Sequence, residues 1–262
     1  GCFSEEIMRE GIQALKELKS RAVEANAKDF AGIATRAFRT AKNGEKYIER
    51  MERECGIDIR IATPEEEARL GFMAAVDAGD FDPDRLVVWD IGGGGSSLVM
   101  KDDRGQYRFY FSELASVVLR DTIIRSIQNK SSNVKSPNPM SEEDVEAALQ
   151  LVRGDAASIP VELRRKIADP STTIVGVGPV HYHSVRGQVG TMNFYQRGDV
   201  VSKLRDRTGM SDEEIDSPWA DTEVVNLILV LGFLDALELE VVEVMNLNVA
   251  DGVLVDPRYW SE

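Results

Sequence analysis

The sequence predicts an α/β protein, because segments typical of strands and of helices alternate along its 262 residues. Three observations carry this prediction. The run 57–61 alternates strictly between apolar and polar residues, as a half-buried strand does. A strong helix start follows at Thr63-Pro64. The segment 224–239 is apolar on nearly every side, which is typical of a central buried helix.

The first part of the chain contains two clear helix starts. Ser4 is a good N-cap, and the two acids after it suit the positive end of a helix dipole. Residues 30–35 resemble a strand, and Asn43-Gly44 separates them from a further helix up to Cys55. Thr63 is expected to cap the next helix, with Glu66 completing a capping box. We expect that helix to end near Gly79.

The charged segment 80–85 contains Pro83 and predicts a boundary between two domains, 1–82 and 83–262. Three strands are expected just after it, at 86–90, 96–100 and 107–111, and the short turns between them predict an antiparallel meander. Ser141 then begins a helix, 172–176 reads as a buried strand, and 241–245 as the last strand. The helices among these strands predict a helical insertion in the second domain.

The glycine run after Asp90 is the sharpest feature of the sequence. Gly92 to Gly95 are four consecutive glycines, more than a tight turn needs. Glycine allows backbone N–H groups to approach a ligand closely, and successive N–H groups can form a concave anion site. An aspartate just before such a turn can hold a hydrated Mg²⁺ against the same phosphate. A plain flexible hairpin turn is the alternative interpretation.

Two common phosphate motifs do not fit this run. No lysine follows the glycines, so it is not a Walker A loop. A dinucleotide fingerprint requires a helix after the glycines, whereas residues 96–100 resemble a strand. The glycines therefore belong to a β-hairpin, and a phosphate loop between two strands is typical of actin-like folds.

Composition limits the partners. Acidic residues outnumber basic ones by 45 to 31, giving a net charge of −14, so we expect no nucleic-acid binding. An anionic substrate then requires a divalent metal or a local basic site. The cysteines Cys2 and Cys55 form no metal or disulfide pattern, and no apolar run is long enough to cross a membrane. We expect a cytoplasmic protein without membrane partners, and a homodimer is one candidate assembly.

Three blocks of the sequence resemble the Ppx/GppA family of exopolyphosphatases and guanosine pentaphosphate phosphohydrolases. Residues 34–44 resemble its Ala-Thr-Ser-Ala-Leu-Arg-x-Ala-x-Asn-Gly block. Residues 63–70 resemble its Ser-Gly-x-Glu-Glu-Ala-Arg-Leu block, and residues 90–98 its Asp-Ile-Gly-Gly-Gly-Ser-Thr-Glu-Leu block. The resemblance is clear over residues 1–100 and thinner beyond. It implies two actin-like (ribonuclease H-like) domains with an active site in the cleft between them.

The resemblance also implies roles for individual residues. Glu67 falls on the position that activates water, Arg39 on the arginine that faces the phosphates, and Asp90 on the aspartate linked to Mg²⁺. The implied phosphate loop consists of Gly92, Gly93, Gly94, Gly95 and Ser96. Glu67 has a second interpretation as a helix-start acid, and Arg39 as the partner of a surface acid. His181 and His183 are the only histidines, and we expect no metal pair from them.

The chain departs from the family pattern in four places. It begins after the position of the family's first phosphate clamp, Asp-x-Gly-Ser-x-Ser, so we expect a fragment whose first domain lacks its leading strands. Ser97 stands where the family has a glutamate. Gly178-Pro179-Val180 replaces a Gly-Gly-Thr turn, and Ala250 replaces an arginine near the end of the chain.

Three hypotheses for function follow. The first is a Mg²⁺-dependent phosphohydrolase that releases terminal phosphate from inorganic polyphosphate or guanosine pentaphosphate. The charge favours short chains or a nucleotide as substrate, since long polyphosphate would require a basic channel. The second is a catalytically degenerate module that binds a nucleotide or alarmone and regulates a partner. The third, an actin-like kinase or ATPase, ranks last because the block around Glu67 belongs to the phosphatases.

Overall fold

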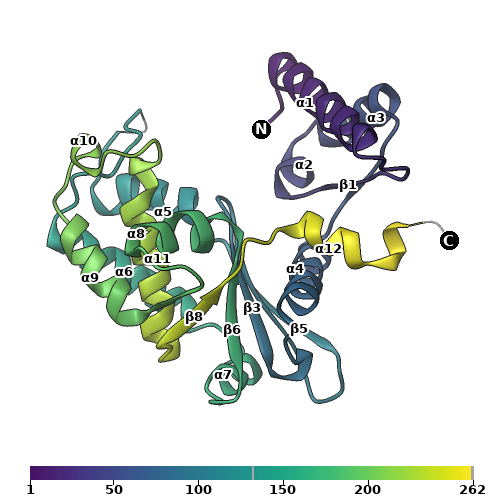
Figure 1. Ribbon diagram of the computed structural model, residues 1–262. Coiled ribbons are helices and arrows are strands. Elements are labelled where there is room, and N and C mark those ends of the chain that lie inside the picture. Colours follow the sequence, from purple (N-terminus) through teal and green to yellow (C-terminus); the bar gives the residue numbers. More distant parts are fainter. Residues whose placement is uncertain (132, 261–262) are drawn as a thin grey trace. The chain divides into compact units, whose positions relative to one another are not determined.

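The structure is a computed structural model that describes residues 1–131 and 133–260 (Figure 1). The chain forms two compact units: unit 1 is Gly1–Ala74 with Val249–Glu262, and unit 2 is Ala75–Asn248. The division falls inside α4 (Pro64–Gly79), earlier than the boundary expected at residue 82. The last segment of the chain groups with unit 1, although the sequence assigned it to the second domain.

Unit 1 is built from helices around a small parallel sheet. Its elements before α4 are α1 (Glu5–Glu24), β1 (Ala31–Ala34), α2 (Arg36–Thr40), α3 (Gly44–Cys55) and β2 (Asp58–Ile61). The predicted cap at Ser4 is confirmed, because its hydroxyl accepts the N–H of Ile7. β1 pairs with β2 in parallel. Apolar residues from α1, α3 and β2, among them Met8, Ile12, Tyr47, Ile48 and Ile59, form the core.

The C-terminal segment of unit 1 packs on the start of α4. It contains α12 (Val249–Val255) and the 3₁₀ turn η4 (Pro257–Tyr259). Gly252 lies so close to Leu70 that a Cβ at Gly252 would be 2.2 Å from the Leu70 carbonyl oxygen. Thr63 caps α4 as predicted, since its hydroxyl accepts the N–H of Glu66. The Glu66 carboxylate accepts instead from the hydroxyl of Tyr259, 2.8 Å away, a contact that the capping-box pattern does not foresee.

Unit 2 contains a six-stranded mixed sheet in the order β5-β4-β3-β6-β8-β7. The strands are β3 (Leu86–Ile91), β4 (Ser96–Lys101), β5 (Tyr107–Ser112), β6 (Thr173–Val177), β7 (Phe194–Gln196) and β8 (Val241–Val244). The predicted meander is confirmed, because β3 pairs with β4 and β4 with β5, both antiparallel. β6 pairs with β3 in parallel, so the carboxyl ends of these two strands lie at one edge.

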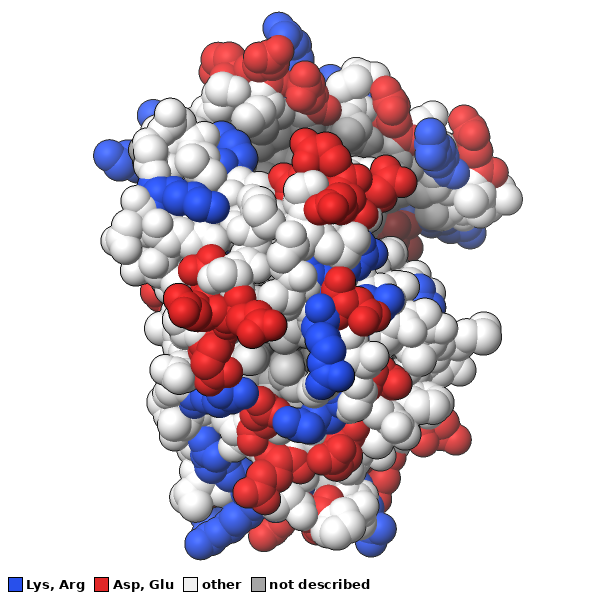
Figure 2. All heavy atoms as spheres, turned by 90° about the vertical axis from the view of Figure 1, so that its left-hand side faces the viewer, with Lys and Arg blue, Asp and Glu red and all other residues white. Residues whose placement is uncertain are grey.

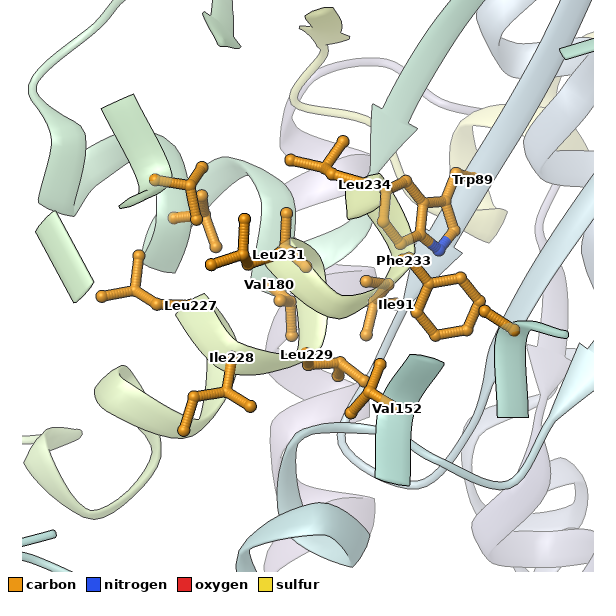
Figure 3. Packing of buried hydrophobic residues seen from close by; sticks show 14 of the residues in the cluster. Trp89, Ile91, Val152, Val180, Leu227, Ile228, Leu229, Leu231, Phe233 and Leu234 are labelled. Carbon is orange, nitrogen blue, oxygen red and sulfur yellow. The ribbon is translucent and has the colours of Figure 1, made fainter. Parts of the chain in front are cut away.

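Helices cover one face of this sheet, with α6, α9 and α11 gathered on one side of it in Figure 1. The helices of unit 2 are α5 (Ser116–Thr122), α6 (Glu142–Ala156), α7 (Val161–Ile167), α8 (Arg186–Val189), α9 (Arg197–Arg207), α10 (Asp212–Ile215) and α11 (Ala220–Leu237), with a 3₁₀ turn η1 (Pro83–Arg85) and π-helical η2 (Ile123–Ile127) and η3 (Val180–Val185). The prediction of a central buried helix is confirmed by α11. Its residues Leu229, Phe233 and Leu234 pack with Trp89 and Ile91 of β3 in one core (Figure 3).

Among the helices of the described residues, none combines the length and the apolar character that crossing a membrane requires.

Candidate functional site

The alternation of side chains along β3 places one carboxylate away from the core. Trp89 and Ile91 are fully buried and belong to the core with α11. Successive residues of a strand point to opposite faces, so Asp90 lies on the other face of the sheet. Asp90 pairs with Ser97 on β4 and with Val177 on β6, and paired residues share a face. The carboxylate therefore stands at the carboxyl ends of two parallel strands, where open α/β sheets bind ligands.

The glycine turn follows β3 directly, and hydrogen bonds to the start of α5 hold it in place. The N–H of Gly92 donates to the Gly95 carbonyl over 3.0 Å, which closes the turn. The carbonyls of Gly92 and Gly93 accept from the N–H groups of Ser116 (3.3 Å) and Val117 (2.9 Å) at the start of α5. Within the described part of the chain, the N–H groups of Gly93, Gly94 and Gly95 have no hydrogen-bond partner. They are the donors that an anion can use.

The turn itself does not require glycine at its first two positions. Neither Gly92 nor Gly93 adopts a left-handed backbone conformation. A Cβ on Gly92 would have its nearest contact at 3.7 Å, and one on Gly93 at 3.6 Å, both ordinary van der Waals distances. Glycine destabilises the folded chain relative to alanine through its entropy. The close approach of a ligand to the backbone is a physical reason for these glycines that the turn does not supply.

Gly178, by contrast, is required by the structure around it. It follows β6, has a φ of +83°, and a Cβ there would lie 2.3 Å from Oδ1 of Asp90. Its N–H donates to the Leu247 carbonyl. The turn that differs from the family pattern at Pro179 and Val180 thus keeps the one glycine against which the Asp90 carboxylate packs.

The two serines after the turn have opposite orientations. Ser96 is buried, and its hydroxyl donates to the Leu114 carbonyl over 3.0 Å. The predicted phosphate role of Ser96 must therefore be amended for its side chain, because strand alternation directs it to the core. Ser97, directly opposite Asp90, is half-buried and lies on the face of the carboxylate. The residue that replaces the family's glutamate is the one beside Asp90.

Unit 1 brings Arg39 and Glu67 together. Nη1 of Arg39, on α2, lies 2.9 Å from Oε2 of Glu67, in the first turn of α4. The same nitrogen donates to the Ala62 carbonyl over 2.6 Å. The side chains keep 22% and 26% of their exposure, so both reach solvent while remaining fixed. An oriented carboxylate beside a guanidinium suits proton abstraction next to an anion.

A metal ion at Asp90 is compatible with these residues. Among residues 1–131 and 133–260, no three His, Cys, Asp or Glu side chains converge on a metal position. Mg²⁺ does not need such a cluster, since it is commonly bound by one or two carboxylates together with substrate phosphates and water. Asp90 with a phosphate on the neighbouring turn fits that pattern.

The two histidines have different surroundings. His181 is completely buried, and its Nδ1 lies 2.7 Å from the hydroxyl of Tyr195. Its ring meets Trp89 edge-on at 4.6 Å between centroids. Burial lowers the pKa of His181 from 6.5 to about 3, so the ring is neutral. His183, on the same π-helical segment, is exposed.

Comparison with known proteins assigns this chain to a family. The family model described as "Ppx/GppA phosphatase family" matches residues 1–202. The chain belongs to the Ppx/GppA phosphatase family. Exopolyphosphatase 1 of Mycobacterium tuberculosis is 30% identical over 83 residues, which are 32% of this chain. The match spans 24% of the length of that relative.

Solved structures establish the fold of this Ppx/GppA chain. The Aquifex aeolicus Ppx/GppA enzyme superposes with a TM-score of 0.77 at 23% identity, covering 97% of this chain and 84% of the other. An exopolyphosphatase from Cytophaga hutchinsonii superposes with a TM-score of 0.70 at 19% identity, covering 97% of this chain and 82% of the other. The predicted actin-like two-domain α/β fold is confirmed.

Sequence reasoning missed the polar support behind the glycine turn. Asp155, Ser112 and Tyr110 form a hydrogen-bonded cluster there. One local feature of the sequence could have pointed to this cluster: Asp155 lies at the C-terminal end of α6, where the helix dipole disfavours an acid. The contacts of Asp256 with Arg69 and Arg258 were also missed.

Proposed function

We propose that this chain carries a metal-dependent phosphohydrolase that releases terminal phosphate from inorganic polyphosphate or guanosine pentaphosphate. One observation carries the proposal. Asp90 stands beside a turn in which, among the described residues, the N–H groups of Gly93, Gly94 and Gly95 have no hydrogen-bond partner, and the turn does not need glycine at its first two positions. Membership in a phosphatase family supports phosphoryl transfer as the chemistry.

In this proposal Glu67 accepts a proton from the attacking water. The water oxygen forms a bond to the terminal phosphorus, the bridging P–O bond breaks, and its electrons leave with the shortened chain. Arg39 lies beside Glu67 and faces the equatorial phosphate oxygens, whose charge must be spread during transfer. The N–H groups of Gly93, Gly94 and Gly95 supply fixed donors to phosphate oxygens.

Mg²⁺ is part of the proposal. Asp90 would hold the ion, and Ser97 offers a hydroxyl on the same face. When bound, the metal neutralises charge on the phosphates. The protein groups perform the remaining tasks: they bind the anion, orient the water and take its proton.

Charge favours a short or nucleotide substrate within this class. The chain carries a net charge of −14. On the face shown in Figure 2, acidic and basic side chains are interspersed rather than gathered into one basic stripe. Long polyphosphate gains affinity from each phosphate that a cation neutralises, so it would favour such a stripe.

The test is phosphate release by the full-length protein with Mg²⁺ and either tripolyphosphate, long polyphosphate or guanosine pentaphosphate. We expect release in at least one case, loss of release with EDTA, and a fall of about 10²–10⁴-fold in Glu67→Gln. Glu65→Gln, an exposed acid in the same helical turn, is the matched control and should keep full activity. Equal rates in Glu67→Gln and Glu65→Gln would reject the role of Glu67.

A second function, a nucleotide- or alarmone-binding regulatory module, is favoured by one observation. Ser97 occupies the position directly opposite Asp90, where the family resemblance places a glutamate. Loss of a carboxylate there weakens catalysis without removing the N–H donors. Tight binding of guanosine pentaphosphate in calorimetry, with no phosphate release over hours, would favour this module over the enzyme. The cytoplasmic location and the homodimer stay predictions.

A further inference from the structure

An aspartate lies at the C-terminal end of α6, where the helix dipole disfavours an acid. Asp155 lies in the last turn of α6, next to its final residue. The carbonyl end of a helix carries partial negative charge, so a carboxylate there is disfavoured. A residue that breaks a local rule usually has a compensating contact elsewhere. For Asp155 that contact is the end of β5.

The Asp155 carboxylate is bound by two hydroxyls of β5. Its Oδ2 accepts from Ser112 Oγ at 2.6 Å and from the Tyr110 hydroxyl at 2.9 Å. Ser112 and Tyr110 are both buried. Hydrogen bonds to a carboxylate are stronger than those between neutral groups, most of all where water is excluded. Asp155 therefore fixes the C-terminal end of β5 firmly.

The contacts continue from Ser112 to the glycine turn. Ser112 Oγ accepts from the Leu114 N–H at 2.9 Å, and the Leu114 carbonyl accepts from the hydroxyl of Ser96 at 3.0 Å. Ser96 is the first residue after the turn and pairs directly with Ser112. The segment fixed in this way leads within three residues to Ser116 and Val117, whose N–H groups bond the carbonyls of the turn.

Those carbonyls decide where the free donors point. Ser116 and Val117 bond the carbonyls of Gly92 and Gly93 on one side of the turn. Each carbonyl shares a rigid peptide plane with the next N–H, which points the opposite way. Holding the carbonyls of Gly92 and Gly93 therefore aims the N–H groups of Gly93 and Gly94 away from α5, out of the turn. A glycine run without this support would sample many conformations.

We propose that Asp155 is a positioning residue for phosphate binding: through Ser112 and the segment 112–117 it fixes the direction of the N–H groups of the glycine turn. The proposal rests on the proposed function of that turn. Asp155 touches neither phosphate nor metal in this scheme and acts only through the backbone that it holds.

The first experiment compares Asp155→Asn with Asp235→Asn in the full-length protein. Asp235 is a suitable control because its largely buried carboxylate binds Arg153 and Arg197 in the helical layer of unit 2. We expect Asp155→Asn to lower kcat about 10–100-fold, as loss of a supporting partner commonly does, and to raise KM about tenfold because the N–H groups that bind the phosphate are displaced. Asp235→Asn should lower the melting temperature and leave kcat unchanged. Equal kcat in the two variants at equal folded fraction would overturn the proposal.

A second measurement does not depend on activity. In ¹⁵N-labelled protein without ligand, Asp155→Asn and Ser112→Ala should each shift the amide resonances of Gly93 to Gly95, while Asp235→Asn should not. Titration with tripolyphosphate should then move these amides in the wild type and require about tenfold more ligand in both variants. Unshifted glycine amides in Asp155→Asn reject the positioning role, whether or not the wild type hydrolyses any substrate. Shifted amides without hydrolysis support the positioning role and reject the proposed enzyme.

The double variant tests the route through Ser112. If Asp155 acts only through Ser112, Asp155→Asn combined with Ser112→Ala should be no worse than the more damaging single variant. Effects on tripolyphosphate affinity that add fully would contradict this route.

Discussion

The two units hold their candidate groups in opposite ways. In unit 1 the groups are side chains, and Arg39 and Glu67 hold each other through an ion pair. In unit 2 the candidate donors are backbone N–H groups of Gly93 to Gly95, residues without side chains. The groups of unit 1 should therefore be damaged by substitutions that remove a charge, and those of unit 2 by substitutions that add a side chain. This difference predicts which substitutions should damage each set.

Removing charge from unit 1 should have the largest effect. Arg39→Ala deletes the guanidinium that pairs with Glu67 and that we propose faces the phosphates, and we expect kcat/KM to fall on the order of 10²–10³-fold. Arg36→Ala, an exposed arginine on the same short helix, is the control and should change the rate less than about twofold. The measurement is phosphate release with Mg²⁺. A rate for Arg39→Ala within a few-fold of the wild type would place the arginine outside the chemistry.

Adding volume to unit 2 should separate binding from stability. In Gly93→Ala the new Cβ has room in the protein, so we expect an unchanged melting temperature but about tenfold weaker tripolyphosphate binding. In Gly178→Ala the φ of +83° and the Asp90 oxygen oppose the Cβ. The left-handed conformation alone should destabilise that variant by about 1–2 kcal/mol. Calorimetry and thermal unfolding of both variants check this, and a destabilised Gly93→Ala would show that the turn needs its glycine structurally.

Adding a negative charge to unit 2 should strengthen the proposed metal site. Ser97→Glu places a second carboxylate opposite Asp90, and we expect the Mg²⁺ concentration for half-maximal activity to fall by about tenfold, because more anionic ligands bind the cation more tightly. Ser97→Gln has the same length without the charge and should show no such gain. An identical Mg²⁺ dependence in the two variants would mean that Asp90 binds no metal beside this position.

The smallest effect concerns the core of unit 2. The pKa of His181 is about 3 in the folded protein and near 6.5 when unfolded. Between these values the unfolded chain binds the extra proton, so stability falls as pH drops below 6.5, by at most about 1.4 kcal/mol per pH unit. His181→Gln should flatten the melting temperature between pH 7 and pH 5 by a few degrees, whereas His183→Gln, at an exposed position, should not. Parallel curves for all three proteins would mean that the buried ring gains no proton on unfolding.

Local signals were sufficient for much of the fold and failed where distant segments meet. The hairpin of β3 and β4, the start of α4 and the buried helix α11 follow from spacing and caps that lie within a few residues. β7 is three residues long and carries no periodicity to detect. The contact of Gly178 with Asp90 depends on parallel pairing of β3 with β6, and Asp155 reaches Ser112 across 43 residues. Sequence patterns singled out the charged residues of the candidate site, but not the residues that support them.

The N–H groups of the glycine turn should respond differently to pH and salt than the charged side chains of unit 1. A backbone N–H does not ionise within the range in which proteins stay folded, so its attraction for an anion is unchanged by protonation of the protein. Acidification would act on the carboxylates, or on the phosphate itself. Added salt should likewise weaken the half-exposed Arg39–Glu67 pair more than these short-range hydrogen bonds. The phosphate binding proposed for unit 2 should therefore persist at low pH or high salt, conditions that weaken the proton transfer proposed for unit 1.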